Sequence, residues 1–198
     1  MPYLLKSFFQ RKTKLVAKEL LGKILVRRSN SIALSGIIVE TEAYVGSHDL
    51  ACHTSRGKTN RNQVMFRTGG IWYIYFTYGM HYLLNIVTEP AGKGAAVLIR
   101  ALEPLEGIDE MKKNRNKPKI TELTSGPGKL TQALKINLSL NATSAFDKSA
   151  RLLIKDNGIK IPKSKIIATS RIGVDYAKEW KDKPLRFYIK DNKFVSKK

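Results

Sequence analysis

The segment at residues 71–87 constrains the fold more than any other part of the sequence, because it predicts a β-hairpin. Residues 71–76, IWYIYF, are dense in aromatic and β-branched side chains, which are typical of strands. A short turn, TYGM at 77–80, separates them from a second apolar run, HYLLNIV at 81–87. Two such runs joined by a short glycine-containing turn favour an antiparallel pair, with Tyr78 beside its tip.

Further strand-like runs outnumber the helical ones. They occur at residues 24–28, 35–44, 95–102, 151–155, 166–170 and 185–190. The turn Ser29-Asn30-Ser31 joins the first two of these runs into another hairpin. We therefore predict a single domain over residues 1–198, of mixed α/β (α+β) class, with a curved, largely antiparallel sheet and peripheral helices. We expect the basic terminal run, FVSKK, to fray.

Three helices are predicted around this sheet. The first spans 13–21, with Thr13 as its N-cap and Gly22 ending it. Its expected apolar face consists of Leu15, Val16, Ala17, Leu20 and Leu21. A second helix is expected from about residue 105 to 112. A short third helix should begin in SGPGKLTQAL, where Ser125 can cap and Pro127 suits the first turn.

The charge of the chain indicates an anionic partner. Lys and Arg number 36 against 16 acidic residues, a formal net charge of +20, and the excess is spread along the chain. Nucleic acid is the favoured partner over an anionic membrane face or an acidic protein, and the alternative is a basicity that reflects proteome composition alone. A single cysteine, Cys52, suits a reducing compartment, and no signal peptide or membrane span is evident, so a cytoplasmic location is expected.

Candidate catalytic residues occur where a predicted strand meets the long irregular stretch at 45–70, a loop length that is usually functional or disordered. Side chains two apart on a strand share a face, so Glu40, Glu42 and Tyr44 should project together, with neighbouring carboxylates about 7 Å apart. Two close negative charges raise at least one pKa, which suits a general base. The alternative is that either glutamate pairs with one of the many cations.

Several other polar residues need partners. Arg100, within the apolar AAVLIRAL, requires a carboxylate or phosphate, and Glu42 is a natural candidate. Asn85, inside LLNIV, needs hydrogen bonds or a ligand. Lys129 follows free backbone N–H groups in SGPGK, a weak phosphate-binding pattern. His48 and His53 match no zinc spacing, so no metal is expected, and His53 is able to stack on a planar ligand.

Eight stretches together resemble the alkyladenine (3-methyladenine) DNA glycosylase family. They are LLGKILVRR, IVETEAYVGSHDLACH, TNRNQVMF, IYFTYGMHYLLNIV, VLIRALEPLEG, LTSGPGKLTQAL, SRIGV and KPLRFYI. They occur in the family's order from about residue 13 to 188, so the resemblance covers nearly the whole chain. It implies one mixed α/β domain without a helix-hairpin-helix motif, and a reaction without cofactor or catalytic metal.

The resemblance also implies residue roles. Glu42 resembles the general base that activates water, and Arg100 its partner in holding that water. Base-stacking walls are implied for Tyr44, His53 and Tyr75, and crowding of the guanine 2-amino group for Asn85. Tyr78, with Met80 beside it, resembles the wedge that fills the gap in the duplex.

The implied activity is monofunctional: a damaged purine such as 3-methyladenine is flipped from double-stranded DNA and its N-glycosidic bond is hydrolysed, leaving an abasic site for base excision repair. A monomer is expected. Cys52 replaces a usual small residue, and the loop at 60–63 varies, which leaves the fine contacts of this loop open. The competing hypothesis is a basic RNA- or DNA-binding module without catalysis, in which the tyrosines stack and Glu42 is structural.

Overall fold

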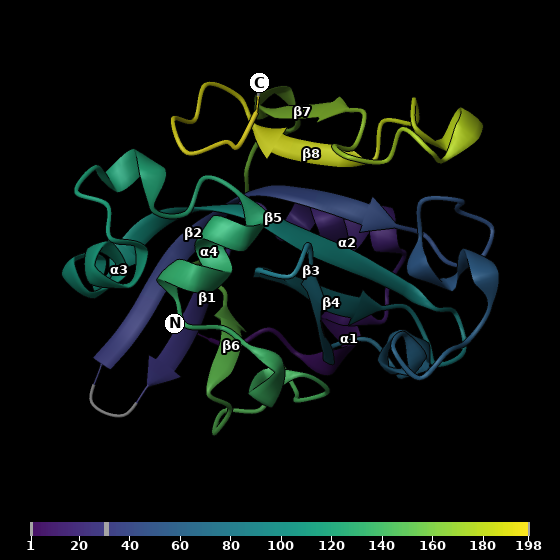
Figure 1. The fold of residues 1–198 in the computed structure, drawn as a ribbon, viewed down its shortest axis with the longest axis horizontal. Helices are drawn as coiled ribbons and strands as arrows, with labels where there is room; N and C mark the ends of the chain where they lie inside the picture. The colour runs from purple at the N-terminus through teal and green to yellow at the C-terminus, as the bar shows by residue number, and fades with distance from the viewer. Residues whose placement is uncertain (1, 30–31, 198) are drawn as a thin grey trace.

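The computed structural model describes residues 2–29 and 32–197, and its centre is one antiparallel sheet of eight strands (Figure 1). The strands are β1 (Ile24–Ser29), β2 (Ile32–Tyr44), β3 (Trp72–Thr77), β4 (His81–Thr88), β5 (Ala95–Glu106), β6 (Leu152–Lys155), β7 (Ile166–Thr169) and β8 (Arg186–Ile189). The main order is β3-β4-β5-β2-β1-β6, and β8 joins through β2 and carries β7. The mixed α/β class and the antiparallel sheet expected from the sequence are confirmed.

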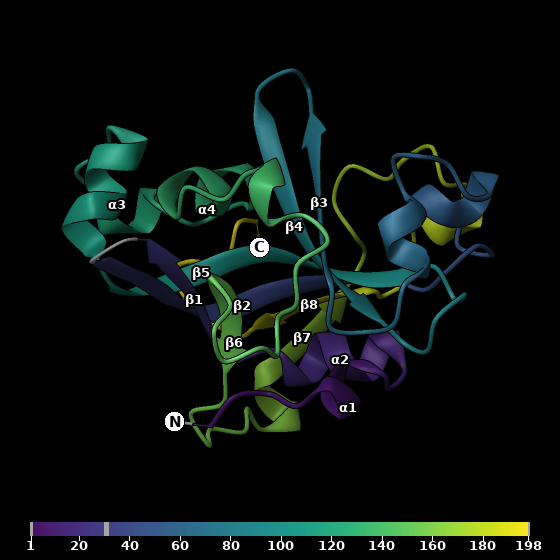
Figure 2. The same ribbon diagram turned by 90° about the horizontal axis from the view of Figure 1, so that it is seen from below.

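Four α-helices surround the sheet in the described part of the chain. They are α1 (Lys6–Phe9), α2 (Thr13–Glu19), α3 (Ile108–Arg115) and α4 (Pro127–Ala133). Figure 2 shows α1 and α2 on the side of the sheet opposite to that from which the β3–β4 hairpin projects, with α3 and α4 beside the hairpin. Within residues 2–29 and 32–197, none of the helices has the length and apolar character needed to cross a membrane.

Strand β2 organises the sheet, because it has neighbours along both edges. It pairs with β5 on one edge, and on the other first with β1 and then with β8. The β2–β5 register shifts twice near its middle: Ile38 pairs with Leu102, Glu40 with Ala101 and Thr41 with Ile99. One residue of each strand, Val39 and Arg100, is therefore extra, a β-bulge geometry that is common beside functional sites.

The main core lies between the sheet and the helices. Val16, Ala17 and Leu20 of the first helix are fully buried, as predicted, but Leu15 is 43% exposed and does not belong to the core. Thr13 is not the N-cap, because Lys12 occupies that position without a capping bond. The Thr13 hydroxyl instead makes hydrogen bonds to residues far away in the sequence.

The Thr13 hydroxyl donates to Oε1 of Glu89 at 2.6 Å, and the Thr88 hydroxyl donates to Thr13 at 3.0 Å. The start of the next helix also differs from the prediction. The second predicted helix begins at Ile108 rather than near 105, because β5 continues to Glu106 and Gly107 turns the chain with φ 73°.

Pro127 occupies the first turn of α4 as predicted, but Gly126, not Ser125, is the N-cap. The Ser125 hydroxyl instead accepts from Lys129 Nζ at 3.5 Å. The first predicted hairpin is present as β1 and β2, whereas the turn at Ser29-Asn30-Ser31 falls partly outside the described residues, which omit 30–31.

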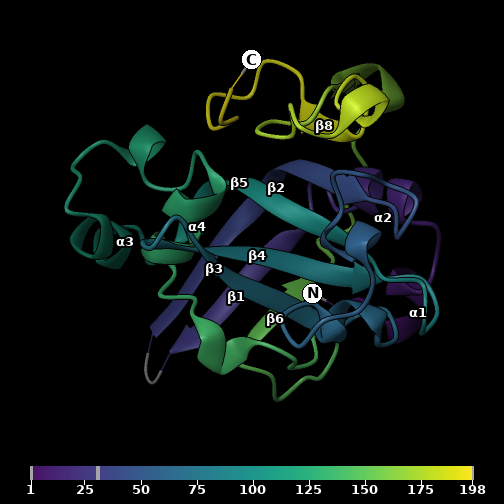
Figure 3. The same ribbon diagram turned by 45° about the vertical axis from the view of Figure 1, so that its right-hand side comes forward.

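The expectation that FVSKK frays is not met by residues 194–197, which make contacts with the body of the protein, whereas Lys198 lies outside the described residues. Val195 is buried, and both the backbone N–H and the hydroxyl of Ser196 bind the carboxylate of Glu40. Lys197 accepts a hydrogen bond from Arg186 through its carbonyl oxygen at 2.8 Å. The segment 194–197 is therefore attached to the centre of the sheet, beside β8 (Figure 3).

Candidate active site

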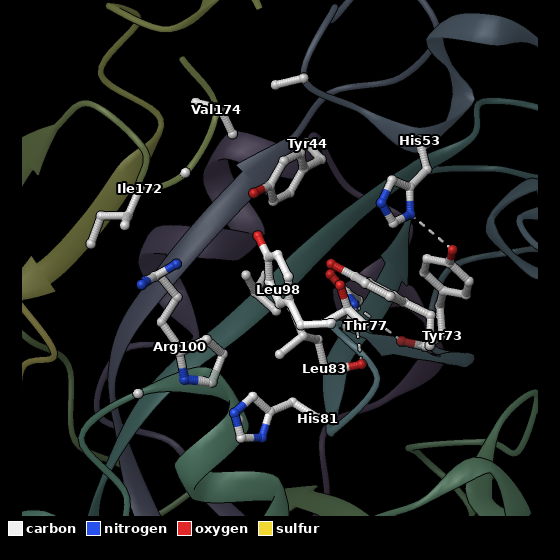
Figure 4. A pocket seen from close by; sticks show the side chains of 18 of the residues that line it. Tyr44, His53, Tyr73, Thr77, His81, Leu83, Leu98, Arg100, Ile172 and Val174 are labelled. Carbon is white, nitrogen blue, oxygen red and sulfur yellow. Dashed lines mark hydrogen bonds between the residues drawn. The ribbon is translucent and has the colours of Figure 1, made fainter. Parts of the chain in front are cut away.

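A cavity of about 570 Å³ opens between the β3–β4 hairpin, the C-terminal end of β2 and the loop after β7. Its volume is within the range of small-molecule sites. Figure 4 shows side chains from these separate elements converging on it. Predicted site residues that line it are Tyr44, His53, Tyr75, Tyr78, Asn85, Arg100 and Lys129.

Aromatic side chains form one wall of this cavity. Side chains alternate along β3: Trp72 and Ile74 belong to the main core, whereas Tyr73 and Tyr75 face the cavity. The His53 ring packs edge-on against Tyr75, with centroids 4.6 Å apart, and its Nδ1 lies 2.9 Å from the Tyr73 hydroxyl. The cavity therefore presents π-faces and edges suited to a flat ring.

The electrostatics of this wall keep it uncharged. His53 is partly exposed, yet desolvation by burial and, secondarily, the charge of Arg61 lower its pKa to about 4. Desolvation raises the pKa of Tyr73 to about 12, and it raises the pKa of Tyr75 as well. The imidazole and both phenols are neutral near pH 7.

Glu42 is fully buried directly behind the cavity wall. Its Oε2 accepts a hydrogen bond from the Tyr44 hydroxyl at 2.9 Å, and its Oε1 accepts the Ile172 N–H at 2.8 Å. Arg100 Nη1 lies 3.2 Å from the same Oε1. Glu42 itself is not a lining residue, but all three of its partners line the cavity.

Glu40 has different surroundings. It is also fully buried, but its carboxylate contacts Arg186, which does not line the cavity: Arg100 Nε lies at 3.2 Å and Arg186 Nη1 at 2.9 Å. Ser196 supplies two further donors to it. The two carboxylates project to the same side, as strand periodicity predicts, yet only Glu42 adjoins the cavity.

Arg100 joins the two carboxylates. Burial alone would lower the pKa of its guanidinium, but the charges of Glu42 and Glu40 raise the pKa above its ordinary value. The partner predicted for Arg100, Glu42, is confirmed, and Glu40 is a second partner that the sequence did not single out. With Arg186, the buried cluster contains two positive and two negative charges.

Asn85 is buried beside the aromatic wall. Its Nδ2 donates to the carbonyl oxygens of Tyr73 at 3.2 Å and Leu83 at 3.5 Å. The side-chain amide is therefore fixed in orientation where it borders the cavity, and the hydrogen bonds predicted for it are present.

The tip of the β3–β4 hairpin reaches away from the body of the protein (Figure 2). Tyr78 and Met80 are 82% and 68% exposed there, and the Met80 N–H donates to the Thr77 carbonyl oxygen at 3.2 Å. Tyr78 has φ 53° and Gly79 φ 66°, the two consecutive left-handed residues of a tight hairpin turn. A bulky side chain is thus held in solvent at a conformation that costs free energy.

Lys129 lies at the opposite rim, on the first turns of α4, together with the glycines of SGPGK. Gly128 has a steric role, because a Cβ there would approach the His81 ring to 2.9 Å. Arg61 and Arg115 also border the cavity. The aromatic wall is therefore neutral, while Arg61, Arg115 and Lys129 give the cavity a cationic border.

Sequence reasoning missed the ion pair that supports this site. Arg171 and Asp49, both with completely buried side chains, form a bidentate pair at 2.6 and 2.8 Å. The Arg171 guanidinium also lies 4.7 Å from the centroid of the Tyr44 ring. The next residue in the chain, Ile172, donates its backbone N–H to Glu42. No sequence pattern links residues 122 positions apart.

Two cavity residues, Tyr73 and Tyr176, were also missed as site residues. Tyr73 is buried beside Tyr75 on β3, and Tyr176, 67% exposed, had no distinguishing pattern. His48 does not join the site, since its ring packs edge-on against Trp180. In residues 2–29 and 32–197, no three His, Cys, Asp or Glu side chains gather in a group that could hold a metal ion.

Comparison with known proteins gives a consistent family. The sequence profile described as Methylpurine-DNA glycosylase matches residues 7–193. A relative from Francisella tularensis subsp. tularensis (strain WY96-3418) is 50% identical over 194 residues, 98% of each chain. One from Prosthecochloris aestuarii is 50% identical over 196 residues, 98% of this chain and 90% of its own. One from Legionella pneumophila (strain Paris) is 48% identical over 198 residues, 98% of each chain. All three are named "Putative 3-methyladenine DNA glycosylase".

Proposed function

This chain belongs to the methylpurine-DNA glycosylase family, and from that premise we propose that it releases alkylated purines, such as 3-methyladenine, from double-stranded DNA. The reaction is hydrolysis of the N-glycosidic bond and leaves an abasic site. The observation that carries the proposal is the cavity itself: neutral aromatic side chains line it, a buried carboxylate lies directly behind them, and cations border it.

The aromatic wall accounts for recognition of the damaged base. Alkylation at a ring nitrogen gives a purine positive charge, which interacts favourably with the π-faces of Tyr44 and Tyr75. His53, neutral because its pKa is about 4, adds a stacking surface without repelling that charge. Asn85, fixed by two backbone carbonyls, crowds the exocyclic 2-amino group of guanine.

Glu42 acts as the general base in this proposal. The attacking water occupies the place where Tyr44, Arg100 and Ile172 meet, the part of the lining nearest to Glu42. This water replaces the Tyr44 hydroxyl as hydrogen-bond donor to Oε2, loses its proton to Glu42 and attacks the sugar carbon as the base departs. The same negative charge stabilises the electron-poor sugar.

Water as the nucleophile has a consequence for the product. An alkylated purine is already a good leaving group, so the chemistry needs no amine nucleophile and no covalent enzyme intermediate. We therefore expect a monofunctional enzyme that leaves the abasic strand uncut.

The hairpin tip and the cationic rim hold the DNA. A base must leave the stack to reach the cavity, at a cost of a few kcal/mol that is smaller for a damaged pair. Tyr78, held in solvent beside Met80, fills the space the base leaves. Lys129 lies at the rim and contacts backbone phosphate. Action as a monomer in the cytoplasm, on nucleoid DNA, completes the proposal.

The test is release of free base from methylated duplex DNA, separated by chromatography. Glu42→Gln keeps the shape but removes the charge, so it should still bind damaged DNA while single-turnover excision falls by about two to four orders of magnitude. Glu40→Gln is the matched control. It should lose far less rate but more stability, because Arg100 and Arg186 remain buried with one negative charge fewer.

The outcomes separate the alternatives. If Glu40→Gln is the inactive variant and Glu42→Gln stays active, the wrong carboxylate has been assigned. If both variants match the parent, the cluster is structural. If the parent protein binds DNA and releases no base, the chain is a nucleic-acid-binding module without catalysis.

A further inference from the structure

The C-terminal segment 194–197 reaches the cluster behind the cavity, although nothing in the proposed reaction uses it. Three strands contribute the charged members of this cluster: Glu40 and Glu42 come from β2, Arg100 from β5 and Arg186 from β8. Ser196 lies 156 residues from Glu40 in the sequence. Its contacts determine which part of the cluster it can influence.

Ser196 binds the carboxylate of Glu40 at both oxygens. Its backbone N–H donates to Oε2 at 2.7 Å, and its hydroxyl donates to Oε1 at 3.0 Å. Arg100 Nε and Arg186 Nη1 approach the same Oε1 at 3.2 and 2.9 Å. Glu40 is completely buried, so four protein donors replace the water that an ionised carboxylate would otherwise bind.

The same serine also contacts Arg100. Arg100 Nη2 lies 3.4 Å from the Ser196 hydroxyl oxygen, its Nε contacts Glu40, and its Nη1 lies 3.2 Å from Glu42. Each of the three guanidinium nitrogens therefore contacts a different partner. The only one of these partners that adjoins the cavity is Glu42.

The segment is anchored well enough to act as a support. Val195 is buried, the Lys197 carbonyl oxygen accepts from Arg186 Nη1 at 2.8 Å, and Asn192 Nδ2 donates to Glu103 Oε2 at 2.7 Å. These contacts fix the backbone on both sides of Ser196. Figure 3 shows this end of the chain on the β8 side of β2 and β5.

We propose that Ser196 is a positioning residue: through Glu40 it fixes Arg100 in the orientation that holds the attacking water beside Glu42. The inference rests on the proposed function, since it assigns a role within that reaction. Arg100 lies 3.2 Å from each of two carboxylates and is attracted to both by charge, so its orientation also depends on what else binds those partners. Ser196 saturates Glu40 and occupies Nη2, which leaves Nη1 directed at Glu42.

The test compares Ser196→Ala with Ser196→Thr. The alanine variant removes the hydroxyl but keeps the backbone N–H bond to Glu40, and threonine restores the hydroxyl. We expect Ser196→Ala to slow single-turnover excision by about fivefold to fiftyfold, the effect of one hydrogen bond to a charged group. Affinity for lesion-containing duplex should stay within twofold, and Ser196→Thr should recover most of the rate.

Two controls separate positioning from stability. Ser164→Ala removes an exposed hydroxyl between β6 and β7, and should change nothing. Asn192→Ala loosens the same segment at Glu103 but keeps all four donors to Glu40, so it should lower the melting temperature with a smaller loss of rate than Ser196→Ala. Thermal melts of all four variants accompany the kinetics.

The proposal is overturned if Ser196→Ala excises within twofold of the parent rate. It is also overturned if Ser196→Ala loses rate, affinity and melting temperature together to the extent seen in Asn192→Ala, or if Ser196→Thr is as slow as Ser196→Ala. Absence of base release by the parent protein would instead reject the proposed function, and the role of Ser196 with it.

Discussion

Replacing the buried Asp49 by alanine should destabilise the protein more than removal of any exposed charge. Asp49 and Arg171 have completely buried side chains and are joined by two hydrogen bonds at 2.6 and 2.8 Å. Asp49 also accepts the N–H groups of Val45 and Ala51. The substitution leaves Arg171 charged. Burial alone would lower the pKa of its guanidinium, but an arginine side chain keeps its proton in a protein.

The magnitude follows from this burial. Removing one partner of a buried ion pair costs about 3–5 kcal/mol, because the remaining charge is desolvated without compensation. For a domain of this size each kcal/mol lowers the melting temperature by about 2–4 °C, so we expect a decrease of about 6–20 °C. Lys135→Ala is the matched control: it breaks an exposed pair with Glu110, worth about 0–1 kcal/mol.

The assay is urea unfolding followed by circular dichroism, with the midpoint and the slope fitted separately. The double variant Asp49→Ala/Arg171→Ala should cost less than the sum of the two single variants, because it leaves no orphan charge. A loss below about 1 kcal/mol for Asp49→Ala, or strict additivity in the double variant, would refute the reasoning.

Three further predictions concern the hairpin tip, the charge and the cavity wall. Tyr78→Ala should reduce excision more than non-specific DNA binding, because the wedge acts only after the base leaves the stack; equal excision by both proteins would show that Tyr78 is not the wedge. Affinity for DNA should fall steeply with salt, with a slope of about −0.9 in log K against log salt for each phosphate neutralised, given the net charge of +20; a nearly flat plot contradicts phosphate-dominated binding. His53 should titrate near pH 4 in NMR spectra. Because the unfolded chain takes up this proton near pH 6.5, the contribution of His53 to the free energy of unfolding is present above pH 6.5 and is lost as the pH falls toward 4. A titration midpoint at or above 6.5 would show that the ring is not desolvated.

Local patterns in the sequence predicted those features that depend on neighbouring residues. The resemblance to a known family implied Tyr75 as a wall of the pocket, and the need of a buried cation for a partner identified Glu42 beside Arg100. Period-two geometry also put Glu40 on the same side as Glu42. In each case the physical cause acts within a few residues or on one strand.

Features decided by distant residues were not predictable in this way. Threonine is a typical N-cap residue, but the Thr13 hydroxyl donates its hydrogen bond to Glu89, which lies 76 residues away. Strand alternation cannot distinguish Glu40 from Glu42, because the difference lies in Ser196 and Arg186, which reach only one of them. The β-bulge at Arg100 likewise requires both strands of a pair.

The side chains at the hairpin tip contribute little to the packing of the fold. Tyr78 and Met80 are mostly in solvent, and a Cβ added at Gly79 would meet no atom within 4 Å. Substitutions at positions 78 and 80 therefore remove almost no packing, so selection can vary them without eroding the scaffold. A library randomised at these two positions alone would explore how the protein opens a duplex on an unchanged catalytic framework, which makes the tip the natural starting point for evolving new lesion preferences.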